Sequence, residues 1–123
     1  ELLSTYKFPG DKTPIVIDDM IAGGSILTQL NALVEAGARP EIYLAITHPL
    51  LLPTALERLN NPIIKELVVT DTIYIPPTKQ HPKLVVLSLA PLLADAIERI
   101  HAARTISPLL KLTPEEWGDA LHK

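Results

Sequence analysis

The stretch Ile15-Val-Ile-Asp-Asp-Met-Ile-Ala-Gly-Gly-Ser-Ile-Leu27 predicts the fold of this chain. Its apolar start, Ile15 to Ile17, is typical of a strand that is covered on both faces of a sheet. Two aspartates and two glycines follow, and then an apolar-periodic helix begins. A strand, a short loop and a helix in this order form the first half of a crossover unit, so the stretch predicts a parallel sheet.

The same stretch predicts a binding site. Asp18 and Asp19 lie at the predicted carboxyl end of the strand, where open α/β sheets bind ligands. Gly23 and Gly24 allow the backbone to approach a ligand closely, because glycine has no Cβ. The first amides of the following helix have no helical partner and attract anions. Carboxylates suit sugar hydroxyls and free amides suit a phosphate, so we expect a phosphorylated sugar to bind here.

Strand and helix patterns alternate along the rest of the chain. Apolar periodicity, proline at helix starts and glycine or asparagine at helix ends define these segments. The predicted strands are 14–18, 41–47, 66–70 and 83–88, and the predicted helices are 24–36, 53–59, 89–103 and a last one from 113 to 121. In helix 89–103, Ser88 is the expected cap, and the expected buried stripe is Leu92, Leu93, Ala96, Ile97 and Ile100. We therefore predict an α/β fold of three layers, with a mainly parallel sheet flanked by helices.

Composition narrows the function classes. The 123 residues contain 47% apolar residues, no cysteine and a net charge of −3. Without cysteine there is no disulfide or thiolate metal site, and without a basic stripe duplex nucleic acid is not an expected ligand. Charges and prolines interrupt every apolar run, so we expect no membrane span. A mean hydropathy of +0.24 predicts apolar surface that meets another domain or subunit.

Four ordered motifs carry a resemblance to a known family. They are Asp18-Asp19-Met20-Ile21 with Gly23-Gly24-Ser25, Ala45-Ile46-Thr47-His48-Pro49, Val68-Val69-Thr70-Asp71-Thr72-Ile73, and Leu87-Ser88-Leu89-Ala90-Pro91-Leu92-Leu93-Ala94-Asp95-Ala96-Ile97. The chain resembles the C-terminal domain of the ribose-phosphate pyrophosphokinases, also called phosphoribosyl pyrophosphate (PRPP) synthetases. The resemblance implies a type I phosphoribosyltransferase fold over residues 14–108, with residues 1–13 as a leader or truncated linker and residues 109–123 as a helical extension.

The resemblance also implies a reaction and a site. Such enzymes transfer the β,γ-diphosphate of ATP to the C1 hydroxyl of ribose 5-phosphate with Mg²⁺, in nucleotide biosynthesis. It implies a cytoplasmic homo-oligomer, and a missing N-terminal domain that carries most of the ATP site and a catalytic histidine. No catalytic residue is therefore expected in this chain, and we expect it to be inactive by itself. The residues expected to bind ribose 5-phosphate or PRPP are Asp18, Asp19, Ala22, Gly23, Gly24, Ser25 and Ile26, with Asp18 and Asp19 also as metal ligands.

The loop departs from the family pattern at one position. The family usually has Asp-Thr where this chain has the single residue Ala22, so the loop is one residue shorter. This loses a carboxylate, a hydroxyl and one amide. Whether the chain is part of an enzyme therefore stays open. A non-catalytic homologue that binds partners or regulates is one alternative, and another phosphoribosyltransferase is a second.

Two further motifs have simpler interpretations. Thr70-Asp71-Thr72 resembles a functional triplet, but side-chain hydrogen bonds to nearby backbone explain it equally well. His48 ends a predicted strand before a proline, and we interpret it as a structural or surface histidine.

Overall fold

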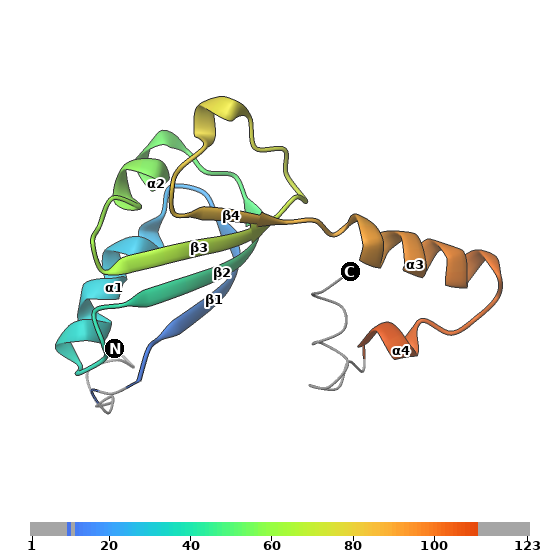
Figure 1. Cartoon of the computed structure of the whole chain (residues 1–123), viewed down its shortest axis with the longest axis horizontal. Helices are drawn as coiled ribbons and strands as arrows, with labels where there is room; N and C mark the ends of the chain where they lie inside the picture. The colour runs from blue at the N-terminus through green and yellow to red at the C-terminus, as the bar shows by residue number, and fades with distance from the viewer. Residues whose placement is uncertain (1–9, 11, 111–123) are drawn as a thin grey trace. The chain divides into compact units, whose positions relative to one another are not determined.

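The computed structural model describes residue 10 and residues 12–110, which fall into two compact units divided between Ser88 and Leu89. The first unit is a four-stranded parallel sheet with strand order β1-β2-β3-β4 (Figure 1). Its strands are β1 (Ile15–Ile21), β2 (Ile42–Pro49), β3 (Ile64–Thr70) and β4 (Leu84–Leu87), and its helices are α1 (Ser25–Glu35), α2 (Pro53–Arg58) and the 3-10 helix η2 (Pro77–Lys79). The second unit contains α3 (Ala90–His101) and α4 (Ser107–Leu110). The predicted α/β fold with a parallel sheet is confirmed.

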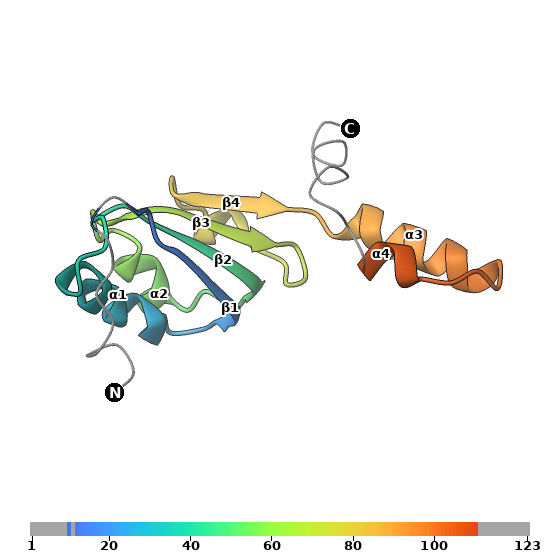
Figure 2. The same ribbon diagram turned by 90° about the horizontal axis from the view of Figure 1, so that it is seen from below.

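The core of the first unit lies between the sheet and two of its helices. Leu27 and Leu30 of α1 and Ala55 of α2 pack with Leu44 of β2 and Leu67 of β3, and all five side chains are buried. Figure 2 shows both helices on the same side of the sheet. The predicted apolar face of α1 is confirmed, since Ile26, Leu33 and Val34 pack partly buried against this core. We call this side of the sheet the covered face.

The opposite side of the sheet, which we call the open face, corrects the prediction that β1 is covered on both faces. Ile15 is 68% exposed and Ile17 is 79% exposed, so β1 is not covered on both faces within the described residues.

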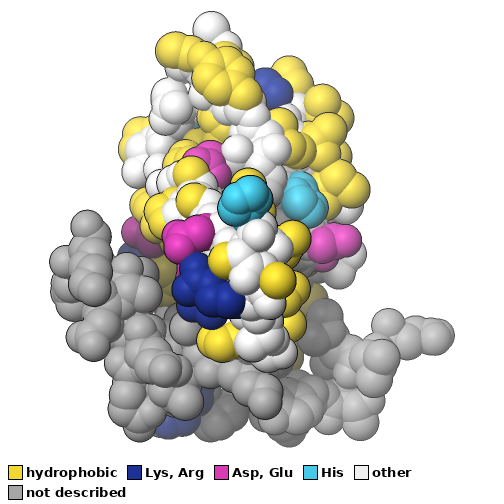
Figure 3. All heavy atoms as spheres, turned by 90° about the vertical axis from the view of Figure 1, so that its right-hand side faces the viewer, with side chains coloured by type: hydrophobic (Ala, Val, Ile, Leu, Met, Phe, Trp, Pro, Cys, Tyr) yellow, Lys and Arg dark blue, Asp and Glu magenta, His cyan; other side chains and the backbone are white. Residues whose placement is uncertain are grey.

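The apolar stripe of α3, in the second unit, also differs from the prediction. Its side chains Leu92, Leu93, Ile97 and Ile100 are exposed rather than buried. An apolar pattern predicts burial because burial of apolar side chains is favourable, but no described segment covers these side chains. Hydrophobic side chains accordingly occupy much of the surface seen in Figure 3.

Several boundaries differ from the sequence predictions. β1 continues to Ile21, so both aspartates lie inside the strand rather than after it. α3 begins after an N-cap at Leu89, one residue later than the expected cap at Ser88. The short helices η2 and α4 were not predicted. The predicted helix 113–121 lies outside the described residues. No helix among the described residues is long and apolar enough to cross a membrane.

The turn before β4 contains a histidine whose ring nitrogens are both engaged. His81 Nδ1 accepts the backbone N–H of Lys83 at 3.2 Å, and His81 Nε2 lies 3.3 Å from Asn60 Oδ1. Lys83 Nζ donates to the carbonyls of Leu59 and Asn61 at 2.9 and 2.7 Å, which connects this turn to the end of α2. Burial, and then the charge of Lys83, lowers the pKa of His81.

This arrangement predicts a pH dependence of stability. A histidine with a lowered pKa in the folded state binds protons more readily when unfolded, so its contribution is complete above the unfolded value of 6.5 and is lost as pH falls below it. Protonation also removes the lone pair that accepts the Lys83 N–H. We expect urea unfolding at about pH 8 and about pH 5 to show a smaller loss of stability in His81→Gln than in wild type. An equal loss in both proteins would contradict this.

Candidate functional site

The two predicted aspartates lie on β1 with opposite orientations. Asp18 pairs in register with Ile46, which is 3% exposed, and so Asp18 projects toward the covered face. Asp19, the next residue along the strand, projects toward the open face and is exposed. The backbone N–H of Asp19 donates to Asp18 Oδ1 at 2.9 Å. The carboxylates therefore do not form a pair, and Asp18 shares the side of the sheet on which the glycine loop and α1 lie.

The loop between β1 and α1 uses its carbonyl groups for internal hydrogen bonds. The amides of Leu51 and Leu52 donate to the carbonyls of Ile21 and Ala22 at 3.1 and 3.0 Å. The Gly24 carbonyl accepts from the Leu27 amide at 3.0 Å. The turn after β2 thus holds the loop after β1 in place. Leu51 has φ 47° and is fully buried, so packing stabilises a left-handed backbone that leucine rarely adopts.

The amide groups of the same loop are, in contrast, not used as donors. Among the described residues, no hydrogen bond is formed by the backbone N–H of Ala22, Gly23 or Gly24. The amides of Ser25 and Ile26 lie in the first turn of α1, where an α-helix has no acceptor for them. The Ser25 hydroxyl also has no partner within the described part of the chain. Five successive amides and one hydroxyl can therefore donate to an anion.

Gly24 determines the shape of this loop. It is the N-cap of α1 with φ 73° and ψ 35°, a left-handed conformation that glycine adopts without strain. A Cβ at this position would lie 3.0 Å from Leu27 Cδ1 and 3.2 Å from Ala55 Cα. The glycine is therefore required both by its backbone angles and by the close approach of α2. At Gly23 the nearest atom to an added Cβ is Thr54 Oγ1 at 3.6 Å, which is an ordinary contact.

Two side chains of α2 contact the loop and were missed by the sequence analysis. Arg58 Nη1 donates to the Gly23 carbonyl at 2.5 Å, and Thr54 Oγ1 donates to the same oxygen at 3.3 Å. The guanidinium of Arg58 is exposed and keeps further N–H donors. It places a positive charge beside the free amides. Nothing in the sequence links Arg58 to a loop 35 residues earlier, because the contact depends on how α2 packs.

The predicted metal ligands match a magnesium site only in part. The described residues contain no group of three or more histidine or acidic side chains that could hold a metal ion. Mg²⁺ is often bound by one or two carboxylates together with water and substrate oxygens. Asp18 or Asp19 could supply one such carboxylate, but the divergence of the two side chains argues against a shared ion.

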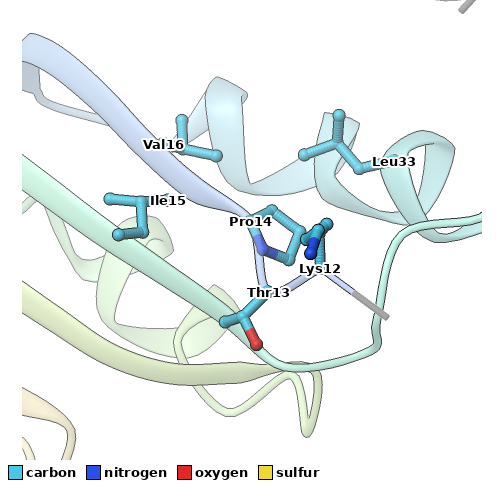
Figure 4. A pocket seen from close by; sticks show the side chains of 6 residues that line it. All are labelled: Lys12, Thr13, Pro14, Ile15, Val16 and Leu33. Atoms are coloured by element: carbon cyan, nitrogen blue, oxygen red, sulfur yellow. The ribbon is translucent and has the colours of Figure 1, made fainter. Parts of the chain in front are cut away.

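Surface hollows lie elsewhere on this unit. One of about 270 Å³ lies between α1 and the start of β1, where Pro14, Ile15, Val16 and Leu33 line it (Figure 4). This is the amino end of β1, opposite to the glycine loop. Another of about 200 Å³ lies on the open face, lined mainly by apolar side chains with Thr47 and Thr70. Neither combines an acidic group with free amides as the glycine loop does.

Comparison with known proteins identifies the family. A model of the phosphoribosyl synthetase-associated domain matches residues 8–111. The chain belongs to this family. Within it, the chain is 52% identical over 102 residues to ribose-phosphate pyrophosphokinase 1 of Lactococcus lactis subsp. lactis (strain IL1403), covering 82% of this chain and 31% of that protein. It is 50% identical over 99 residues to ribose-phosphate pyrophosphokinase of Bacillus subtilis (strain 168), covering 80% and 31%.

A solved structure supports the same assignment of this phosphoribosyl synthetase-associated domain. The crystal structure of phosphoribosylpyrophosphate synthetase from Mycobacterium smegmatis superposes with a TM-score of 0.69 and 42% identity, covering 75% of this chain and 31% of that chain. The chain thus spans about 31% of the length of the relatives it matches. The predicted resemblance to PRPP synthetases is confirmed.

Proposed function

We propose that this chain forms the ribose 5-phosphate-binding part of a ribose-phosphate pyrophosphokinase. The observation that carries the proposal is the asymmetry of the glycine loop, in which carbonyl groups are hydrogen-bonded internally and five amides are free. Such a loop at the carboxyl end of a parallel strand suits the 5-phosphate. The names of relatives at 52% and 50% identity support this substrate over that of another phosphoribosyltransferase.

In this proposal each predicted site residue has a distinct role. Ala22, Gly23, Gly24, Ser25 and Ile26 donate backbone N–H groups to the phosphate, and the Ser25 hydroxyl adds one donor. Asp18 accepts hydrogen bonds from ribose hydroxyls on the covered side of β1, while Asp19 is too divergent to contact the same hydroxyls. Mg²⁺, when present, would supply charge neutralisation for the diphosphate and be held by one aspartate together with substrate oxygens.

The transfer of the ATP diphosphate needs groups beyond this site. The described residues provide no second phosphate loop. The chain matches 31% of the length of these relatives, so we propose that a second domain supplies the ATP site and that the isolated chain binds substrate without turnover. Cytoplasmic location and a homo-oligomeric state are part of the same proposal.

A titration of the 123-residue chain with ribose 5-phosphate tests the proposal. We expect amide NMR shifts at Gly23, Gly24, Ser25 and Ile26, weaker shifts with inorganic phosphate, and none with ribose. Unchanged loop amides up to millimolar ribose 5-phosphate would refute a surviving site.

Arg58 provides a second test. We expect Arg58→Gln to weaken ribose 5-phosphate binding by roughly 3- to 10-fold, because one charge-assisted donor beside the phosphate is lost. Arg39→Gln is the matched control, since Arg39 is also exposed but pairs with Glu41 at 3.3 Å before β2, at the opposite edge of the sheet. Equal affinities of the two variants for ribose 5-phosphate, measured by calorimetry, would contradict a role of Arg58 in phosphate binding.

The open face favours a second candidate function. Exposed apolar side chains such as Ile15, Ile17 and Leu87 on one sheet surface are typical of a protein that binds a partner. A non-catalytic homologue with a shortened loop would use this face and leave the glycine loop empty. The titration above separates the two functions, because only the first requires the loop amides to shift.

A further inference from the structure

A group of hydroxyls connects the carboxyl ends of β2 and β3. Thr70 Oγ1 donates to the Thr47 carbonyl at 2.6 Å, and Thr72 Oγ1 donates to the same carbonyl at 2.9 Å. The local side-chain to backbone bond expected in this triplet is made by the Thr72 backbone N–H, which donates to Thr70 Oγ1 at 3.3 Å, whereas the bonds to Thr47 join β3 to β2. His48, the next residue of β2, places Nδ1 2.9 Å from Thr72 Oγ1.

The hydroxyl contacts favour one tautomer of His48. A carbonyl oxygen can only accept, and that of Thr47 lies 2.6 Å from Thr70 Oγ1 and 2.9 Å from Thr72 Oγ1, whereas the two hydroxyl oxygens lie 3.1 Å apart. When both hydroxyl protons go to the nearer carbonyl, Thr72 Oγ1 has no proton to give to the ring and accepts from it. In that arrangement His48 carries its proton on Nδ1, and Nε2 keeps a lone pair. Within the described residues no group donates to this Nε2, and the side chain is exposed.

The backbone of His48 lies beside the strand that leads into the glycine loop. His48 pairs in register with Met20, two residues after Asp18 and two before Ala22. Neighbouring strands of a sheet are about 4.8 Å apart, so the backbone of His48 lies next to the end of β1 that leads into the glycine loop. An ionised carboxylate, such as that of Asp18 or Asp19, accepts hydrogen bonds and has none to donate. A neutral Nε2 would add an uncharged acceptor at the same carboxyl edge of the sheet.

We propose that His48 Nε2 accepts a hydrogen bond from a hydroxyl of the sugar phosphate, and that Thr72 is the positioning residue that holds the ring in the required tautomer. This inference rests on the proposed function, because it needs a ligand at the glycine loop. It deepens that function by adding a second strand, β2, to a site that the sequence placed on β1 and α1 alone. A vicinal diol then has acceptors on two adjacent strands.

The tautomer can be measured without any ligand. In a long-range proton–nitrogen NMR spectrum of the chain at alkaline pH, His48 should show a protonated Nδ1 and an unprotonated Nε2, the reverse of the form that predominates in free histidine. Thr72→Val should return His48 to the common form, and Thr72→Ser, which keeps the hydroxyl, should not. A wild-type His48 protonated on Nε2 would overturn the assignment.

Ligand titration tests the role of the lone pair. His48→Leu should weaken ribose 5-phosphate binding roughly 3- to 10-fold, as expected for one lost hydrogen bond, and His48→Gln, which keeps an acceptor, should stay within about twofold of wild type. If wild type binds and His48→Leu binds equally well, this inference fails while the proposed function stands. If wild type shows no loop-amide shift, the proposed function itself fails, and the ligand role of His48 with it. Because the His48 side chain is exposed, its substitution should leave the fold intact, and the measurement of the wild-type tautomer needs no variant.

Discussion

Gly24→Ala is expected to destabilise the chain by about 2–4 kcal/mol and to abolish ribose 5-phosphate binding. Alanine at φ 73° is strained, and its Cβ would lie 3.2 Å from the Ala55 backbone, which cannot move without shifting α2. Relief of this contact moves the N-terminus of α1 and separates the free amides. Urea unfolding measures the first effect, and NMR titration with ribose 5-phosphate measures the second.

Gly23→Ala is the matched control for this prediction. The added methyl group meets Thr54 Oγ1 at 3.6 Å, so we expect a stability change within about 1 kcal/mol. The two variants differ by one position and make the same chemical change. If both lost the same stability, the left-handed conformation of Gly24 would not be what determines the loop.

Leu44→Ala is expected to destabilise the chain by about 2–5 kcal/mol. Leu44 is 0% exposed in the centre of the covered face, where it belongs to the same buried cluster as the buried leucines of α1 and Ala55 of α2. Truncation leaves a cavity that neighbouring strands cannot fill, because β2 is hydrogen-bonded on both sides. The measurement is the midpoint of urea unfolding with an unchanged slope.

Ile17→Ala provides the comparison on the open face. Ile17 is 79% exposed, so its truncation should change stability by no more than about 0.5 kcal/mol. A loss similar to that of Leu44→Ala would show that Ile17 is buried in solution, by self-association or by another part of the chain. The pair of variants therefore also tests the open face.

The strands and helices of the first unit could be predicted well because their local signals agree. Gly37, with φ 100°, ends α1, and Pro53 begins α2. Valine and isoleucine runs mark the strands, and the helix of 24–36 has the period of a one-sided apolar face. The end of β1 was misplaced because Asp18 and Asp19 interrupt the apolar pattern while the backbone continues in strand geometry to Ile21.

The site could be predicted only where its parts are adjacent in sequence. Aspartates followed by a glycine pair indicated the loop and its position at the end of a strand. The contacts from Arg58 and from His48 through Thr72 join segments 35 and 24 residues apart, and no local pattern reports them. The different directions of the two aspartates also became clear only when the register with β2 was known.

The sequence by itself determined the parallel α/β fold, the family and the glycine loop, because periodicity, turn residues and neighbouring motifs are local properties of a chain. The tertiary structure alone decided which loop groups are free: the amides of the turn after β2 donate to the carbonyls of Ile21 and Ala22, while no described group accepts from the amides of the loop. It also decided which apolar side chains are buried. An apolar stripe indicates that burial is favourable, but burial itself requires another segment to cover the stripe. α1 covers β2 in this way, whereas no described segment covers Ile17.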